Sequence, residues 1–85
     1  MNIQEYTDYI KAIDPMVAKA DYNWRRAYDK MNYPSVLLGA HGHLQWQEVH
    51  AWCQEQFGKE HYTWTGSRFW FDQEKDAVLF ALRWA

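Results

Sequence analysis

The stretch HYTWTGSRFWF, residues 61–71, decides how this 85-residue chain folds. Gly66-Ser67 forms a two-residue turn with glycine first, and the segments on both sides are rich in β-branched and aromatic residues. This pattern predicts a β-hairpin. Alternation along the strands divides the side chains into two sets, one for each face of the hairpin. The first set is Tyr62, Trp64, Phe69 and Phe71, and the second is Thr63, Thr65, Arg68 and Trp70.

The residues after the hairpin predict a C-terminal helix. Asp72 is a candidate N-cap, and acidic residues follow it in the first turn. The apolar face of this helix comprises Ala77, Phe80, Ala81 and Trp84. The opposite side is also apolar, with Val78, Leu79 and Leu82, so a third strand over residues 77–84 is the alternative.

Before the hairpin, apolar residues at helical spacing predict a third helix from Leu44 to Phe57. Its buried side comprises Trp46, Val49, Trp52, Cys53 and Phe57. Gly58 stands where a left-handed cap is expected. Residues 34–43 contain two glycines and a proline around a short apolar run, so we interpret them as a connector, either a loop or a very short strand.

Two helices are predicted at the N-terminus. The first has an apolar face of Ile3, Tyr6, Ile10 and Ile13. Asp14-Pro15 is typical of a second helix start, and Tyr33-Pro34 is expected to end that helix. The buried stripe of the second helix is predicted to be Met16, Val17, Ala20, Trp24, Ala27, Tyr28 and Met31.

The whole chain, residues 1–85, is therefore expected to be a single α+β domain with one core. The net charge is −2 and the signs alternate along the chain, so no basic or acidic tract points to a nucleic acid or a membrane. Cys53 is the only cysteine and there is no N-terminal signal peptide, which indicates a cytoplasmic protein without an internal disulfide. The longest apolar stretch, residues 77–82, is too short to cross a bilayer.

The C-terminal half resembles small uncharacterised proteins of tailed bacteriophages. The residues that carry the resemblance are Trp52-Cys53, Phe57-Gly58, Tyr62, Trp64, Gly66, Phe69, Phe71, Asp76-Ala77, Phe80 and Leu82-Arg83-Trp84. They cover about forty residues and are mainly positions that shape the fold. The resemblance implies a compact hairpin–helix unit, a phage origin and the host cytoplasm as location, and it transfers no catalytic residue. Phages encode many proteins of this size that bind and disable host machinery or defence factors, which implies a host protein as partner.

Aromatic residues make up 19% of the chain, with six tryptophans, and this exceeds what one small core needs. We therefore expect exposed rings. One outward strip of the second helix is predicted from Lys19, Tyr22, Arg26, Lys30 and Tyr33, which recur at steps of three and four. The alternative is an ordinary solvated face, partly neutralised by Asp21 and Asp29.

The hairpin supplies a second candidate surface. If Tyr62, Phe69 and their set face the core, Arg68 and Trp70 face outward as possible anchor residues. The alternative is that these long side chains only cover the back of a thin sheet.

A metal site is a less favoured hypothesis. His41, His43, His50 and Cys53 supply four nitrogen and sulfur ligands, but their spacing matches no standard zinc motif. His50 and Cys53 also lack the third group and the oxyanion donor that a catalytic pair needs. We expect no enzymatic activity and no cofactor.

These features together predict a small non-enzymatic binding protein. It would act by occupying the surface of a host protein, as an inhibitor or an anti-defence protein. The alternative is nucleic-acid or nucleotide binding through the same basic and aromatic strip. We also expect a homo-oligomer, because a thin sheet leaves exposed edges.

Overall fold

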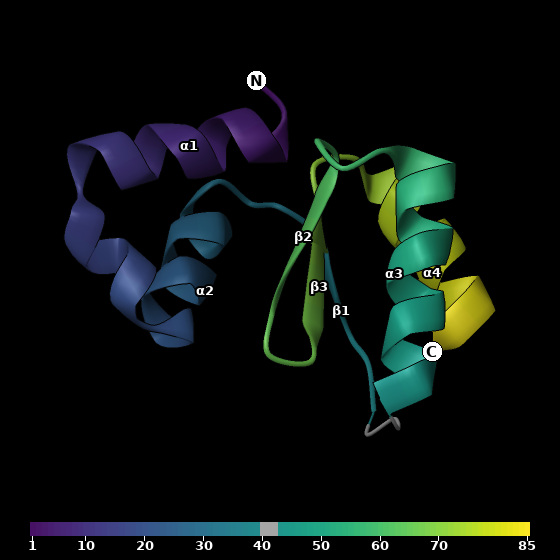
Figure 1. The fold of residues 1–85 in the computed structure, drawn as a ribbon. Helices are drawn as coiled ribbons and strands as arrows, with labels where there is room; N and C mark the ends of the chain where they lie inside the picture. Colours follow the sequence, from purple (N-terminus) through teal and green to yellow (C-terminus); the bar gives the residue numbers. More distant parts are fainter. Residues whose placement is uncertain (40–42) are drawn as a thin grey trace.

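The computed structural model describes residues 1–39 and 43–85, and it confirms the α+β class and the predicted order of elements. A small antiparallel sheet lies between two layers of helices, α1 with α2 on one face and α3 with α4 on the other (Figure 1). The elements are α1 Ile3–Ile13, the 3-10 helix η1 Pro15–Lys19, α2 Asp21–Lys30, β1 Ser35–Leu37, α3 His43–Phe57, β2 Tyr62–Thr65, β3 Arg68–Phe71 and α4 Glu74–Trp84. Within the described ranges, no helix has the length and apolar character needed to cross a membrane.

The hairpin has the predicted register. Thr65 pairs with Arg68 across the turn and Trp64 pairs with Phe69, so the two alternating sets of side chains are confirmed. Gly66 has a φ of +58°, a conformation that glycine adopts without steric cost. The connector contains the very short strand β1, which pairs with β3. The sheet therefore has three strands in the order β1-β3-β2, with β3 in the centre.

The face of the sheet toward α3 and α4 carries the larger cluster of buried side chains. It comprises Leu38, Val49, Cys53, Tyr62, Phe69, Phe71, Ala77 and Phe80. The apolar faces predicted for α3 and α4 are confirmed, and the strand alternative for residues 77–84 is wrong. Gly58 caps α3 with a φ of +84°, and its N–H donates to the carbonyl of Gln54 at 3.1 Å.

The opposite face of the sheet is also covered, by α1 and α2. A second cluster forms there from Ile3, Tyr6, Ala27, Tyr28 and Trp70. The rings of Tyr28 and Trp70 lie 5.5 Å apart between centroids, and the hydroxyl of Tyr6 donates to the carbonyl of Ala27 at 3.1 Å. The hairpin therefore has no open back, because the N-terminal helices pack on it.

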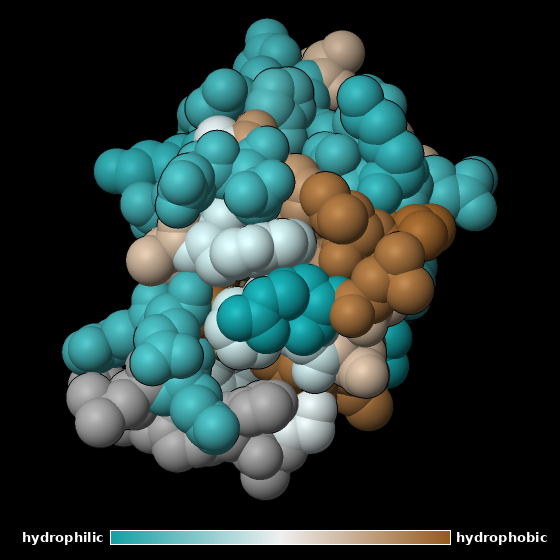
Figure 2. Space-filling model, turned by 90° about the vertical axis from the view of Figure 1, so that its right-hand side faces the viewer, coloured by the Kyte–Doolittle hydropathy of each residue, from teal (hydrophilic) through white to brown (hydrophobic). Residues whose placement is uncertain are grey.

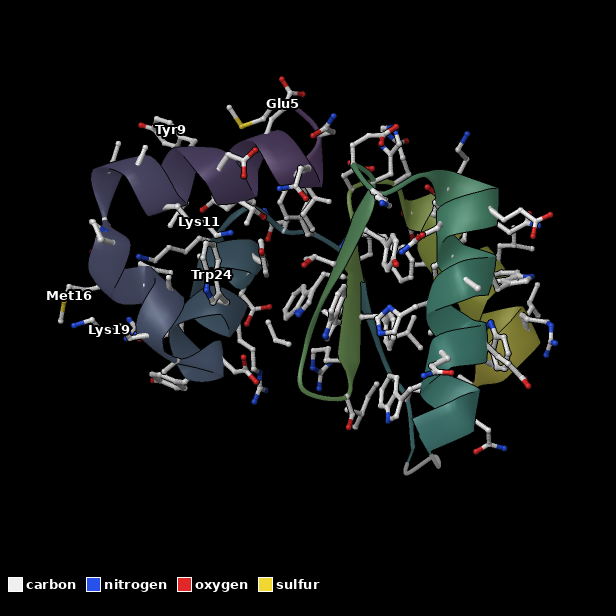
Figure 3. The ribbon with its side chains drawn as sticks, in the orientation of Figure 1. Glu5, Tyr9, Lys11, Met16, Lys19 and Trp24 are labelled. Carbon is white, nitrogen blue, oxygen red and sulfur yellow. The ribbon has the colours of Figure 1, made fainter. Side chains whose placement is uncertain are left out.

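The prediction of one continuous second helix is wrong. Residues 15–19 form η1, and Ala20 is extended, with φ −152° and ψ 142°, before α2 begins at Asp21. The predicted stripe assumed an unbroken helical period, so it fails at both ends: Met16 is 62% exposed, and Ala20 and Met31 are exposed as well. Met16 and Lys19 point away from the sheet at the outer end of this layer (Figure 3).

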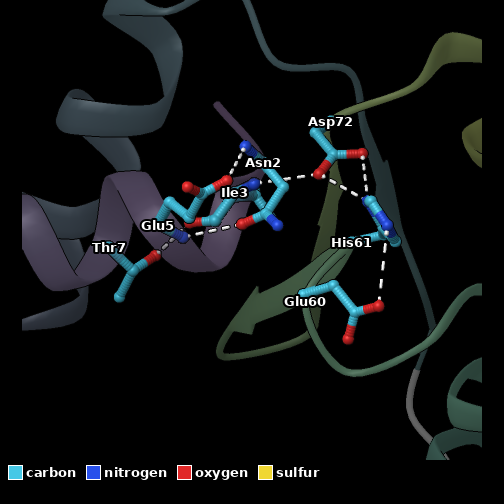
Figure 4. A network of polar contacts seen from close by, with 7 residues as sticks. All are labelled: Asn2, Ile3, Glu5, Thr7, Glu60, His61 and Asp72. Atoms are coloured by element: carbon cyan, nitrogen blue, oxygen red, sulfur yellow. Dashed lines mark hydrogen bonds and ion pairs between the residues drawn. The ribbon is translucent and has the colours of Figure 1, made fainter.

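Asp72 does not cap α4. The N-cap residue is Gln73, which makes no side-chain capping bond. The Asp72 carboxylate instead accepts a hydrogen bond from the backbone N–H of Ile3 at 2.9 Å and lies 3.0 Å from Nδ1 of His61 (Figure 4). A carboxylate at the N-terminus of α1 complements the helix dipole. Asp72 thus joins the first helix to the C-terminal half of the chain.

Candidate protein-binding surface

The outer side of α2 carries the central part of the predicted strip. Tyr22, Arg26 and Lys30 are exposed there, opposite the buried Ala27 and Tyr28. The Tyr22 side chain is 63% exposed, and the guanidinium carbon of Arg26 lies 5.8 Å from the centroid of its ring. This distance is within the range of a cation–π contact. The strip therefore combines an exposed phenol ring with two cationic side chains on one helix.

The two ends of the predicted strip do not belong to it. Lys19 is exposed, but it lies in η1, and the extended Ala20 breaks the helical spacing to Tyr22. After α2, Asn32 has a φ of +57°, so Tyr33 no longer follows the helix. Tyr33 is half-buried against the ring of Tyr6 at 5.8 Å, so its predicted place on the outward strip is wrong.

The prediction that Trp70 faces outward is also wrong. Trp70 is 1% exposed, and its Nε1 donates to the hydroxyl of Thr65 at 2.8 Å. It is buried because α1 and α2 cover this face of the sheet. The exposed tryptophan of the hairpin is Trp64 from the other set, at 50%. Nothing in the hairpin pattern distinguishes the two rings.

Arg68 lies beside α2 in an open hollow of about 450 Å³. The hollow is formed by the start of α2, the hairpin turn and the end of β1, and its lining includes Asp21, Tyr22, Arg25, Leu37 and Arg68. Arg68 is half-buried and donates to the hydroxyl of Ser35 at 3.1 Å. The two candidate surfaces of the sequence, one on the second helix and one on the hairpin, thus meet in the tertiary structure. We call Tyr22, Arg25, Arg26, Leu37 and Arg68 the α2–hairpin surface.

The sequence interpretation missed two members of this surface. Arg25 lies next to Arg26 in the sequence but off the strip of steps of three and four, and only the position of the hairpin turn brings it into the hollow. Leu37 is an exposed residue at the end of β1, in the segment interpreted as a connector. The sequence signal for Arg25 was the pair of adjacent arginines, whereas Leu37 had none.

The cations around α2 are not neutralised by direct ion pairs. In the described ranges, no carboxylate lies within 4.0 Å of Arg25, Arg26 or Lys30, and the recorded ion pairs both involve His61. Asp21 and Asp29, the expected neutralising residues, form no such pair with them. Arg25, Arg26 and Lys30 can therefore contact a partner without first breaking an ion pair, although the exposed Asp21 and Asp29 on the same helix offset part of their charge.

The structure does not support a metal site among the residues that it describes. His41 and the side chain of His43 lie outside the description, while His50 and Cys53 belong to the layer between α3 and the sheet. Burial lowers the pKa of His50 and raises the pKa of Cys53 to about 12, so the thiol is protonated at neutral pH. Zinc binding and nucleophilic attack both need the thiolate. No group of three potential ligands occurs within the described ranges.

A second exposed apolar region lies on α4. Figure 2 shows hydrophobic side chains gathered on the α3–α4 side of the molecule. The exposed apolar residues of α4 are Val78, Leu79 and Leu82, and Leu82 is 81% exposed. The second apolar side of the C-terminal helix, read in the sequence as a sign of a strand, is therefore a surface strip, which we call the α4 strip.

No protein-family model, curated protein or solved structure matches this chain. What the α2–hairpin surface can bind therefore has to follow from its side chains. Tyrosine and arginine are enriched among the residues that dominate protein interfaces, because each combines a large contact area with hydrogen-bonding groups. Arginines without internal partners favour carboxylates or phosphates, which they contact through two parallel N–H donors.

Proposed function

We propose that the protein is a non-enzymatic binding protein that occupies an acidic surface of a partner protein through the α2–hairpin surface. One observation carries the proposal: an exposed Tyr22 ring stands beside Arg25 and Arg26, which lack internal ion pairs, at the rim of an open hollow. Leu37 and Arg68 complete the hollow on the hairpin side.

The arrangement supports a protein partner for a physical reason. The exposed Tyr22 and Leu37 supply apolar area, and two arginines, Arg25 and Arg68, line the same hollow against a single carboxylate, that of Asp21. Apolar anchors within a charged rim are typical of protein interfaces. The charge steers an acidic partner toward the surface and fixes its orientation.

The kind of partner comes from the resemblance of the C-terminal half to small bacteriophage proteins. We extend the proposal to a host protein as partner, and to inhibition of host machinery or defence as the result of binding. Self-association also remains part of the proposal, and the α4 strip is the apolar surface that would be buried in a homo-oligomer. The α2–hairpin surface lies in the other helical layer, so both surfaces can be occupied at once.

The proposal is tested by capture of partners from a host cell lysate and identification by mass spectrometry. The variant Arg25→Glu with Arg26→Glu should lose a protein that the wild type retains. Lys75→Glu, which changes an exposed cation at the start of α4, is the matched control and should retain it. Reversal of two charges that face an acidic partner replaces attraction by like-charge repulsion and should weaken binding by about a hundredfold, or more than 2 kcal/mol. Equal capture by both variants contradicts the proposal.

The contact between Tyr22 and Arg26 also favours the nucleic-acid alternative, since bases stack on aromatic rings and arginine planes. The net charge of −2 opposes it. Titration with single-stranded oligonucleotides and free nucleotides at two salt concentrations separates the two functions. Phosphate binding weakens steeply as salt rises, whereas a protein-only binder gives no response.

A further inference from the structure

β2 forms one edge of the sheet, and its backbone groups alternate between the sheet and the open side. Thr65 and Arg68 flank the two-residue turn and form a hydrogen-bonded pair, so Thr63 and Thr65 direct their N–H and C=O groups toward β3. The N–H of Asp72 donates to the carbonyl of His61 at 3.4 Å, which agrees with this alternation. Tyr62 and Trp64 therefore direct their backbone groups toward the free edge.

The first outward carbonyl of this edge already has a partner. The N–H of Gln4, in the first turn of α1, donates to the carbonyl of Glu60 at 3.2 Å. Beyond that point α1 makes no further contact of this kind: in the described part of the chain, neither Tyr62 nor Trp64 has a backbone–backbone hydrogen bond outside the sheet. The edge is thus occupied at its start, covered at Tyr62, which is 4% exposed, and open at Trp64, which is 50% exposed.

An open hollow of about 370 Å³ runs along this edge. Its walls come from α1, α3 and the loop before β2, and its lining comprises Gln4, Thr7, Lys11, Gln54, Lys59, Tyr62, Thr63 and Trp64. Figure 1 shows β2 at the edge of the sheet, between the two layers of helices. The half-exposed Trp64 ring supplies apolar contact area at one end.

The charge of the hollow is one-sided. Lys11 and Lys59 line it, no acidic residue does, and neither lysine has a carboxylate within 4.0 Å in the described ranges. A second copy of the chain paired edge to edge would bring four lysines into one groove, which like-charge repulsion disfavours. A segment that carries carboxylates complements it.

We propose that the free edge of β2 binds an extended acidic peptide of a partner protein as an added strand. The peptide backbone pairs with Trp64, and its carboxylates contact Lys11 and Lys59. Main-chain pairing gives such complexes their affinity, and the side chains give specificity. This site shares no residue with the α2–hairpin surface, so it stands whether or not that surface binds a partner.

The test is a titration of the isotope-labelled full chain, followed by the chemical shifts of its backbone amides. The probe is a synthetic peptide of about eight residues that alternates Glu and Val, a length typical of single strands. We expect the largest shifts at the amide of Trp64 and at the amides of its neighbours in β2. The matched peptide with Lys in place of Glu should give none.

Two further comparisons test the mechanism. Methylation of alternate backbone nitrogens of the acidic peptide, on the side that pairs, should weaken binding about tenfold, because hydrogen bonds to β2 are lost. Lys11→Glu with Lys59→Glu should also weaken it about tenfold and allow the Lys peptide to bind. Lys30→Glu on α2 is the matched control and should leave the acidic peptide bound as before.

Several results would overturn the proposal. They are the absence of shifts at β2, equal binding of the methylated peptide, and self-association through this edge in place of peptide binding. Arg25→Glu with Arg26→Glu should not affect the peptide, so failure here is distinguishable from failure of the α2–hairpin surface. Circular dichroism of each variant shows that its fold is retained.

Discussion

The two faces of one sheet pack against interiors of different chemistry. Toward α3 and α4, the buried side chains are almost entirely apolar, and Phe80 lies 4.8 Å from Phe69 between ring centroids. Toward α1 and α2, the buried side chains include several with hydroxyls, and the Thr7 hydroxyl lies 2.8 Å from that of Tyr28. The α3–α4 side therefore depends on apolar burial, whereas the α1–α2 side also depends on buried hydrogen bonds.

The two sides of the sheet are expected to differ in their local stability. A buried hydrogen bond contributes only about 1 kcal/mol net, but the loss of one partner leaves a desolvated polar atom. The α1–α2 layer also depends on two contacts with the C-terminal half, from the N–H of Ile3 to Asp72 and from the N–H of Gln4 to Glu60. We therefore expect α1 and α2 to open at a lower free energy than the α3–α4 side.

The largest expected effect concerns Cys53, which is fully buried on the α3–α4 side. Burial raises its pKa from 9.0 to about 12, so the thiolate that reacts with alkylating reagents is scarce below that pH. At a pH of about 8, alkylation should be about a thousandfold slower in the folded protein than in the unfolded chain, for this pKa difference alone. Mass spectrometry of timed samples measures the rate.

The control for the Cys53 experiment places the thiol on the other layer. Cys53→Ala with Ala12→Cys moves it to an exposed position of α1, where it should react at nearly the rate of the unfolded chain. In mild urea, Cys53 should stay protected after α1 and α2 have opened. Loss of its protection together with the opening of α1 would show that the two layers unfold as one unit.

Phe80→Ala tests the apolar side directly. The ring is fully buried between Phe69 and Phe71, and its removal leaves a cavity. We expect the free energy of unfolding to fall by about 3–5 kcal/mol, which is much of the stability of a domain of this size. Urea unfolding followed by circular dichroism measures it. Lys75→Ala, on the exposed side of the same helix and outside the α4 strip, should change it by less than about 0.5 kcal/mol.

The smallest effect is expected on the other side of the sheet. Tyr28→Phe removes the hydroxyl that contacts Thr7 and should lower the free energy of unfolding by about 1 kcal/mol. Thr7→Val removes the other hydroxyl and should have a similar cost. The double variant should cost less than the sum of the two single changes, because both remove the same bond. Strict additivity would mean that this bond contributes nothing to the α1–α2 layer.

Much of the fold could be predicted from the residues around Gly66-Ser67 and Gly58. The turn residues, the alternation of the strands and the apolar spacing of residues 44–57 and 77–84 are local patterns, and the structure confirms each of them. The second helix was predicted less well. Apolar spacing could not show that Ala20 is extended, because a break of one residue leaves the pattern nearly unchanged.

The candidate surface, too, was predicted correctly only where local patterns determine it. Tyr22, Arg26 and Lys30 are exposed as predicted, since their spacing within one helix determines which way they face. Trp70 and Tyr33 were misplaced, and Arg25 and Leu37 were missed. Each of these four depends on how α1, α2 and β1 lie against the hairpin.

The sequence alone determined that a hairpin with two alternating sets of side chains packs among amphipathic helices. Only the tertiary structure decided that helices pack on both faces of the hairpin, and that Trp70 is buried there while Trp64 stays half-exposed. The physical reason is the sequence separation over which each interaction acts. Alternation and capping act between neighbours in the chain, whereas the helix that covers Trp70 is held by a bond from Ile3 to Asp72, 69 residues apart.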